Sequence, residues 1–219
     1  MKRFVTSSLA CFCLLSNTQA FSLSLSDFGN PFVDVPRYAM WRSEMEEKVN
    51  STFALITPKA EQNKWQLAND KVVLGDINEY AEANWIPKSD KLFDYSECVT
   101  IYFENMPNAV ARGAMKKYEN MTQYIDKYKE DTDDDYKFDI KVLQINDKEA
   151  IVELHRYEKG VSGLVKKDPQ AKRIERWIMS GDWLISLRYS IRPSKNEEKG
   201  LAWEQLKNTW LERFSNVQF

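Results

Sequence analysis

The chain's only histidine, His155, is the middle one of three side chains with acid–base capability at alternate positions. Glu153 stands two residues before it and Tyr157 two residues after it. Side chains at alternate positions of a β-strand point to the same face, so an extended segment here places all three together. A Glu–His–Tyr cluster can carry general acid–base catalysis. The competing interpretation is a solvent-facing strand position with polar cross-strand neighbours.

Cys98 is a second candidate, as a thiol nucleophile that His155 would activate. Cys11 and Cys13 fall in an N-terminal segment that we expect to be removed, so Cys98 would be alone in the mature chain, without an intramolecular disulfide. A lone cysteine on a strand is more often a small buried hydrophobic residue. Burial also fits an oxidising compartment, where an exposed thiol forms intermolecular disulfides. We therefore predict no catalytic residue, with His155, Glu153 and Cys98 as the weak candidates.

The acidic run before residue 136 is similar to the start of a calcium loop. Asp131, Asp133 and Asp135 have the first three spacings of an EF-hand. The sixth position, however, is Tyr136 instead of glycine, and the twelfth is Val142 instead of a bidentate glutamate. We predict a solvated loop and no metal, with weak calcium binding as the alternative. The chain has no glycine-rich phosphate loop and no nucleophile elbow, so no cofactor is expected.

Residues 1–20 have the composition of a signal peptide. Lys2 and Arg3 form a basic start, residues 4–15 are mostly apolar, and a polar segment precedes a cut near Ala20. The apolar run is shorter than the ~20 residues that span a bilayer, so no stable membrane anchor is expected. We predict an exported protein, either periplasmic or secreted. Removing Lys2 and Arg3 from 31 basic residues leaves 29 against 33 acidic ones, and a net charge of −4 argues against nucleic acid as a partner.

Two consecutive β-hairpins dominate the second half of the chain. Their strands alternate apolar and polar residues, or are rich in β-branched and aromatic residues. Asn146 and Asp147 supply a first turn whose residues tolerate positive φ, and Gly181 suits a primed turn in the second hairpin. The four predicted strands are residues 136–145, 150–157, 173–179 and 183–191.

Helices and shorter strands flank these hairpins. An apolar residue at every fourth position predicts a helix over residues 38–53, and a similar stripe predicts a C-terminal helix that buries Trp203 and Trp210. Pro107 begins a predicted helix that continues to residue 129. The remaining predicted strands are residues 64–68 and 71–74, joined by a turn, and residues 75–87 and 97–103, for which a helix is the alternative.

These elements predict an α+β fold. We expect an antiparallel sheet built around the two hairpins, with helices packed mainly on one face. Residues 38–219 would form a single domain, long enough to bury a core without a disulfide. Residues 21–37, which contain Pro31 and Pro36, would form an irregular arm.

Three features of the chain together resemble a known family. The segment Trp65-Gln-Leu leads into Val73 and a stretch that ends Trp85-Ile-Pro87; the phrase Phe93-Asp-Tyr-Ser-Glu-Cys-Val-Thr100 precedes a helix; and two hairpins are closed by a C-terminal helix. This order resembles small exported bacterial proteins of unknown function with a PsbP-like α/β/α sandwich, of the kind found in Legionella-like intracellular pathogens. The resemblance covers roughly residues 60–215. It implies a fold, and it supplies no shared catalytic residues.

The leading functional hypothesis is an exported, non-enzymatic binding or interaction protein with a protein partner, such as a virulence-associated or envelope accessory factor. One alternative is a secreted hydrolase around His155, which requires polar side chains converging in a cleft. The other is a small-ligand carrier with an apolar pocket between the sheet and the helices at residues 107–129 and 197–215. Such a pocket needs about 300 Å³ or more. An interaction protein instead needs an exposed apolar or charged patch.

Overall fold

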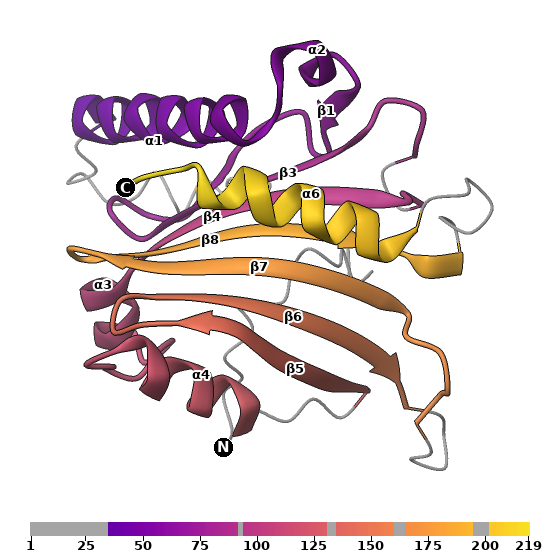
Figure 1. Ribbon diagram of the computed structural model, residues 1–219. Coiled ribbons are helices and arrows are strands. Elements are labelled where there is room, and N and C mark those ends of the chain that lie inside the picture. Colours follow the sequence, from indigo (N-terminus) through magenta and orange to yellow (C-terminus); the bar gives the residue numbers. More distant parts are fainter. Residues whose placement is uncertain (1–34, 92–93, 131–134, 160–164, 195–201) are drawn as a thin grey trace.

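An antiparallel sheet is the centre of the computed structural model, which describes residues 35–91, 94–130, 135–159, 165–194 and 202–219 (Figure 1). Its eight strands are β1 (Trp65–Leu67), β2 (Val73–Leu74), β3 (Tyr80–Pro87), β4 (Glu97–Asn105), β5 (Tyr136–Ile145), β6 (Glu149–Glu158), β7 (Ala171–Ser180) and β8 (Trp183–Ile191). The helices are α1 (Val35–Ile56), α2 (Lys59–Gln62), α3 (Met106–Ala111), α4 (Met121–Glu130) and α6 (Trp203–Ser215). The order of strands is β1-β3-β4-β8-β7-β6-β5, and β2 also pairs with β3. The predicted α+β fold class is confirmed.

The N-terminal predictions fall largely outside this description. The predicted signal peptide, residues 1–20, and most of the predicted arm, residues 21–37, precede the first described residue. The helix predicted from Tyr38 begins at Val35, inside the range of the arm. Across the described ranges, no helix combines the length and the apolar character that crossing a membrane requires.

The two predicted hairpins are β5–β6 and β7–β8. The first pairs Tyr136 with Glu158 at one end and Ile145 with Ala150 at the other, with a bulge between Val142 and Gln144. The second turn is as predicted, because Gly181 has a φ of +57°.

The first turn closes by a different device from the predicted one. Neither Asn146 nor Asp147 has a positive φ. Instead, Asn146 Oδ1 accepts hydrogen bonds from the backbone N–H groups of Lys148 and Glu149, both at 2.9 Å. This is an Asx turn, in which the side chain takes the place of a backbone acceptor.

The two longest helices, α1 and α6, cover one face of the sheet and bury the main core (Figure 1). The predicted stripe of α1, from Trp41 to Phe53, is buried, as predicted for one face of an amphipathic helix. Phe53 stacks on Trp85 of β3 with 4.2 Å between ring centroids. Trp210 of α6 stacks on Tyr189 of β8 at 4.6 Å. Helices far apart in the sequence therefore meet over the central strands.

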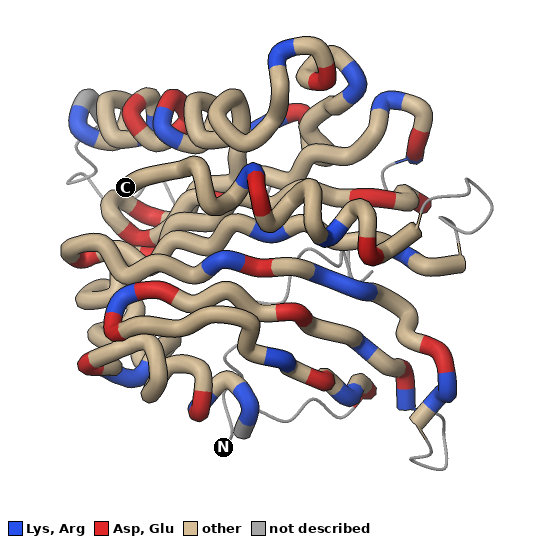
Figure 2. The backbone as a smooth tube through the Cα atoms, in the orientation of Figure 1, with Lys and Arg blue, Asp and Glu red and all other residues tan. Residues whose placement is uncertain are grey.

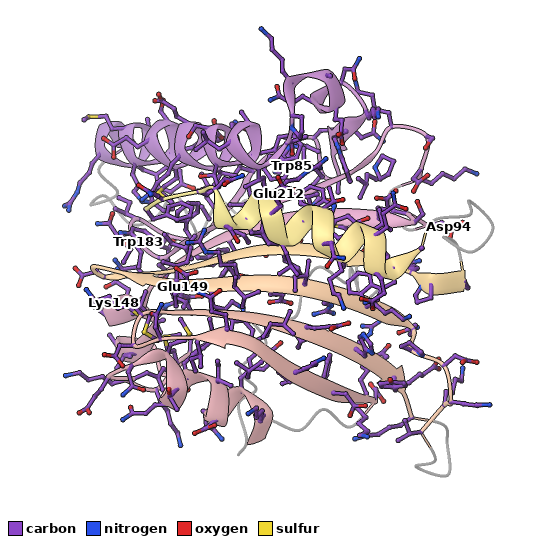
Figure 3. The ribbon with its side chains drawn as sticks, in the orientation of Figure 1. Trp85, Asp94, Lys148, Glu149, Trp183 and Glu212 are labelled. Atoms are coloured by element: carbon purple, nitrogen blue, oxygen red, sulfur yellow. The ribbon has the colours of Figure 1, made fainter. Side chains whose placement is uncertain are left out.

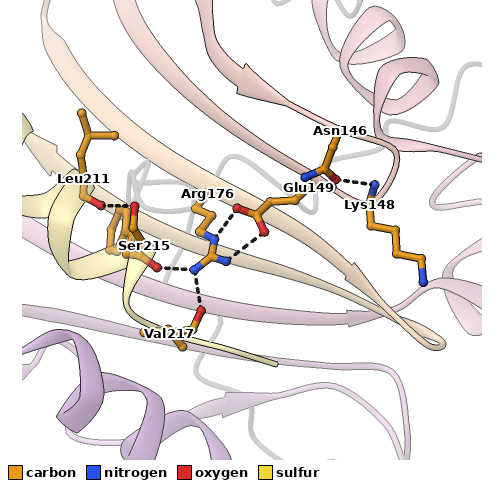
Figure 4. A network of polar contacts seen from close by, with 8 residues as sticks. Asn146, Lys148, Glu149, Arg176, Leu211, Ser215 and Val217 are labelled. Atoms are coloured by element: carbon orange, nitrogen blue, oxygen red, sulfur yellow. Dashed lines mark hydrogen bonds and ion pairs between the residues drawn. The ribbon is translucent and has the colours of Figure 1, made fainter.

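Arg176 fastens the end of α6 to the sheet (Figure 4). Its Nε and Nη2 donate to the two carboxylate oxygens of Glu149, at 2.8 and 2.9 Å. Its Nη1 donates to the backbone carbonyls of Phe214 and Val217, the latter at 2.7 Å. Carbonyls at a helix end have no intrahelical partner, so this guanidinium supplies one. Glu149 and Lys148 lie together at the β5–β6 turn (Figure 3).

The opposite face carries α4, whose Met121 and Ile125 pack in one cluster with Val152 and Trp177. The single helix predicted from Pro107 to residue 129 is wrong, because α3 ends at Ala111 and α4 begins ten positions later. Gly113 has a φ of +69°, a left-handed conformation that terminates helices.

The start of α3 agrees with the prediction. Pro107 occupies the first turn, and the side chain of Asn105 accepts a hydrogen bond from the backbone N–H of Asn108 at 3.1 Å. Proline has no N–H to satisfy there, and an N-cap asparagine satisfies another.

The two short strands near residue 70 do not form the predicted hairpin with each other. Both pair with β3, β1 along residues 85–87 and β2 along residues 81–82. For residues 75–87 and 97–103 the strand interpretation is confirmed over the helical one, because β3 and β4 pair with each other from Tyr80 opposite Glu104 to Trp85 opposite Val99.

Candidate functional site

Glu153 on β6 is the centre of a polar cluster that includes His155. Glu153 Oε1 accepts a hydrogen bond from Trp203 Nε1 at 2.8 Å and lies 3.1 Å from His155 Nε2. Glu153 Oε2 lies 3.3 Å from Lys207 Nζ. The side chain of Glu153 is 9% exposed and that of His155 is 27% exposed. The structure therefore brings His155 and Glu153 into contact at the border between β6 and α6.

The carboxylate of Glu153 is held in its charged form. Burial on its own raises the pKa of Glu153, but the hydrogen bonds from Trp203 and Lys207 outweigh burial and keep the pKa below its ordinary value. For Lys207 the directions are reversed. Burial lowers its pKa, but hydrogen bonds to Glu204 and Glu153 outweigh burial, and the pKa of Lys207 is raised above its ordinary value. A charged carboxylate beside an imidazole orients the ring. The same contacts also fasten α6 to β6.

Cys98 lies away from this cluster, on the opposite face of the sheet. It is on β4, which β8 and β7 separate from β6. Its side chain is buried with Ile86 and Tyr95 and lies 3.7 Å from Thr100 Oγ1. Cys98 is 1% exposed, as predicted for a lone cysteine that acts as a small buried hydrophobic residue. A Cys98–His155 pair does not exist in this fold.

The calcium candidate is only partly described. Asp131 and Asp133 lie outside the described residues, and Asp135 directly precedes β5. Among the residues that the structure describes, no three histidine, cysteine, aspartate or glutamate side chains gather closely enough to hold a metal ion.

A layer of buried and half-buried side chains, most of them polar, lies on the face opposite α1 and α6 and was missed by the sequence analysis. Its members lie directly opposite one another on β3, β4, β8 and β7. One row consists of Glu82, Tyr102, Ser186 and Trp177, and the next row consists of Asn84, Thr100, Arg188 and Glu175.

Glu175 is the most deeply buried acid in this layer, with 0% exposure. Arg188 Nε lies 2.6 Å from its Oε1, and Arg173 Nη1 lies 3.6 Å from the same oxygen. Trp177 Nε1 donates to Oε2 at 2.9 Å. A buried carboxylate is costly unless charges and donors compensate it, and here two guanidinium groups and an indole do so.

A small cavity lies between this layer and α4. Its walls include Tyr124 and Tyr128 of α4, together with Tyr102, Trp177 and Arg188 from the sheet. The space open to the centre of a water molecule is about 20 Å³. That volume holds water but is far below the ~300 Å³ of a small-molecule site. The cavity therefore gives the carrier alternative no support in this conformation.

The polar layer did have a signal in the sequence. Alternating charges on residues 173–177 suggest a solvent-facing strand side. Trp177, however, shares the phase of Arg173 and Glu175, and a tryptophan on a charged face marks that face as covered.

β5 forms an edge of the sheet, and no described segment pairs with its outer side. Phe138, Ile140 and Val142 are half-buried on the α4 face at alternate positions. The positions between them, Lys137, Asp139 and Lys141, carry charges of alternating sign and are exposed. These charges follow one another along the lowest strand in Figure 2. The edge thus offers backbone hydrogen-bonding groups between an apolar and a charged row.

Comparison of the chain with protein-family models, with curated proteins and with solved structures gives no match.

Proposed function

We propose that this is an exported, non-enzymatic binding protein that adds an extended segment of a partner protein to β5. The observation that carries the proposal is the outer side of this ten-residue strand, with which no strand of the described ranges pairs. An unpaired strand edge presents a row of N–H and C=O groups that another chain can pair with. Strand addition is a recurrent mode of peptide recognition, in which backbone hydrogen bonds supply affinity and side chains supply specificity.

The two edges of the sheet are not equivalent, which supports β5 as the docking strand. At the opposite edge, β3 is covered along much of its length by β1 and β2. These two strands have three and two residues, too short to template a long partner strand. Very short edge strands are one way in which proteins avoid unwanted pairing. The long edge at β5 lacks this protection.

The side chains of β5 specify the chemistry of the partner. A strand placed beside β5 would set acidic residues opposite Lys137 and Lys141 and a basic residue opposite Asp139. Directly opposed opposite charges contribute about 0.2–1 kcal/mol each, and like charges destabilise. On the other face, apolar residues would extend the row of Phe138 and Ile140. We therefore expect a partner segment that alternates apolar residues with an acidic–basic–acidic series.

Two features of β5 limit indiscriminate pairing. When β5 pairs with β5 of a second molecule in a register that places lysine opposite lysine, Lys137 and Lys141 repel their counterparts. The bulge at Val142 and Gln144 interrupts the hydrogen-bond ladder. Charged residues and bulges are known protections of sheet edges. They select among partners without closing the edge.

A synthetic peptide tests the proposal directly. The peptide Thr-Val-Glu-Val-Lys-Val-Glu-Val-Thr should bind the purified protein, with amide chemical-shift changes confined to β5 and its neighbour β6. A peptide with proline at its centre should bind more weakly, because proline removes a ladder donor. Shifts elsewhere, or no shifts at millimolar peptide, would contradict strand addition.

Charge reversal separates specific pairing from general attraction. The double variant Lys137→Glu, Lys141→Glu should lose affinity about tenfold, and a peptide with both glutamates changed to lysine should restore it. The matched control is Lys64→Glu, Lys88→Glu, which changes two exposed lysines at the opposite edge by the same total charge. Equal losses in both double variants would show that net charge, and not β5, determines binding.

A hydrolase is the second candidate, because His155 Nε2 lies 3.1 Å from the charged carboxylate of Glu153. His155→Ala should then abolish turnover of a panel of ester and peptide substrates at unchanged stability. A protein without turnover on that panel, or one whose turnover survives His155→Ala, removes this candidate.

Export belongs to the proposal and rests on the composition of residues 1–20. It is tested by fractionating the producing cells and sequencing the N-terminus of the protein. We expect a mature chain that starts at Phe21, in the periplasm or the medium. A full-length chain retained with the cytosolic fraction would contradict export. A virulence or envelope role would follow from the identity of the partner that β5 captures.

A further inference from the structure

Two buried hydroxyl groups in the cavity beneath α4 have no hydrogen-bond partner among the residues that the structure describes. They are Tyr102 Oη and Ser186 Oγ. Tyr102 is 8% exposed and Ser186 is 6% exposed, and both line the cavity. The two residues are direct cross-strand neighbours on β4 and β8, yet their hydroxyls do not bond to each other. Buried hydroxyls in folded proteins are satisfied by protein or by ordered water in the large majority of cases.

The charges around the cavity sum to zero and favour neither an anion nor a cation. Glu82 and Glu175 contribute two negative charges to its walls, and Arg188 contributes one positive charge. Arg173 adds a second positive charge next to Glu175. The four charges cancel, so neither an anion nor a cation gains from entering. A neutral occupant that both donates and accepts hydrogen bonds, and that fits about 20 Å³, suits these walls.

We propose that the cavity is a built site for ordered water, which bridges Tyr102 Oη and Ser186 Oγ. A cavity of this volume with two to four polar neighbours meets the requirements of a buried water molecule. The water would lie between the sheet and α4, because Tyr124 and Tyr128 of α4 form the wall of the cavity opposite the sheet. The site is independent of β5 and of the proposed strand addition.

A double-mutant cycle tests the bridge. Tyr102→Phe, Ser186→Ala and the double variant are compared with the wild type by urea unfolding. Because one water molecule would bond to both hydroxyls, removing one hydroxyl already weakens the binding of the water. Removing the second hydroxyl then lowers the free energy of unfolding by a smaller amount. We expect the unfolding equilibrium constant of the double variant to be about fivefold smaller than the value obtained by adding the free-energy losses of the two single variants. Additive effects would overturn the proposal.

The matched control is the same cycle with Ser190→Ala in place of Ser186→Ala. Ser190 is buried on the same face of β8, but its Oγ donates to the carbonyl of Cys98, at 3.5 Å, and it does not line the cavity. No coupling is expected there. If a variant does not fold, a high-resolution crystal structure of the wild type decides instead. Solvent density within hydrogen-bond distance of both hydroxyls supports the site, and its absence overturns it.

Discussion

Replacing Glu104 with glutamine should remove a defined pH dependence from the stability of this protein. Glu104 lies on β4 and is 4% exposed, and its Oε1 accepts a hydrogen bond from Arg112 Nη2 at 2.8 Å. Arg112 also lies 3.2 Å from Glu79. Burial raises the pKa of Glu104 to about 7, because the attraction of Arg112 offsets only part of it and Glu79 repels the charged form. Tyr80 and Leu184 are its cross-strand neighbours.

The sign and the size follow from the two pKa values. A carboxyl group whose pKa is higher in the folded protein than in the unfolded chain binds its proton more tightly when folded. Its contribution to stability is complete below pH 4.5 and is lost as the pH rises through 7. The two pKa values, 7 and 4.5, differ by 2.5, which corresponds to about 3 kcal/mol. Glutamine does not titrate, so Glu104→Gln should gain about 3 kcal/mol relative to the wild type over this range.

Urea unfolding monitored by tryptophan fluorescence at several pH values measures this difference. Comparing the variant with the wild type at each pH cancels the titration of all other groups. Glu47→Gln is the matched control, because it makes the same chemical change at a glutamate that is exposed on α1. A free-energy gap between Glu104→Gln and the wild type that stays constant across this pH range, or one that changes in the opposite direction, would refute the reasoning and show that Arg112 keeps Glu104 ionised.

Three further predictions concern stability and reactivity. Arg176→Gln should lower the free energy of unfolding by about 2–3 kcal/mol in urea, because Glu149 and two carbonyls at the end of α6 lose a charged donor. Gly181→Ala should cost about 1 kcal/mol in the same assay, because its φ of +57° disfavours a Cβ atom. The thiol of Cys98 should react with a chromogenic disulfide reagent only when the protein unfolds, since it is 1% exposed; rapid reaction of the native protein would contradict its burial.

The elements with one solvent-facing side were predictable from the sequence. The stripe of α1 from Trp41 to Phe53 predicted a buried face because the other positions of this helix meet water. β5 alternates for the same reason, with half-buried and exposed positions in turn. The break between α3 and α4 was not predicted, because apolar residues continue at helical spacing past Gly113. Periodicity does not record the single position where the backbone adopts a positive φ.

In the candidate sites, contacts within one strand were predictable from the sequence, and contacts between elements were not. The contact between Glu153 and His155 was predictable because residues two apart on one strand share a face. Their link to Trp203 and Lys207 was not, because it depends on where α6 packs across the sheet. The buried layer around Glu175 was missed for a different reason. Charges at alternate positions ordinarily face water, and only the tertiary structure shows that this face of β7 is covered.

The accessibility of the charged groups favours binding at β5 over the alternatives. Glu153 contacts Trp203 and Lys207 of α6, so little of its carboxylate faces solvent. The cavity at Glu175 has room for water but not for a small molecule, so a carrier function requires α4 to leave the sheet. Lys137, Asp139 and Lys141 are already in contact with solvent. Strand addition needs no rearrangement of the described structure, and rearrangement reduces apparent affinity by the fraction of molecules in the competent state.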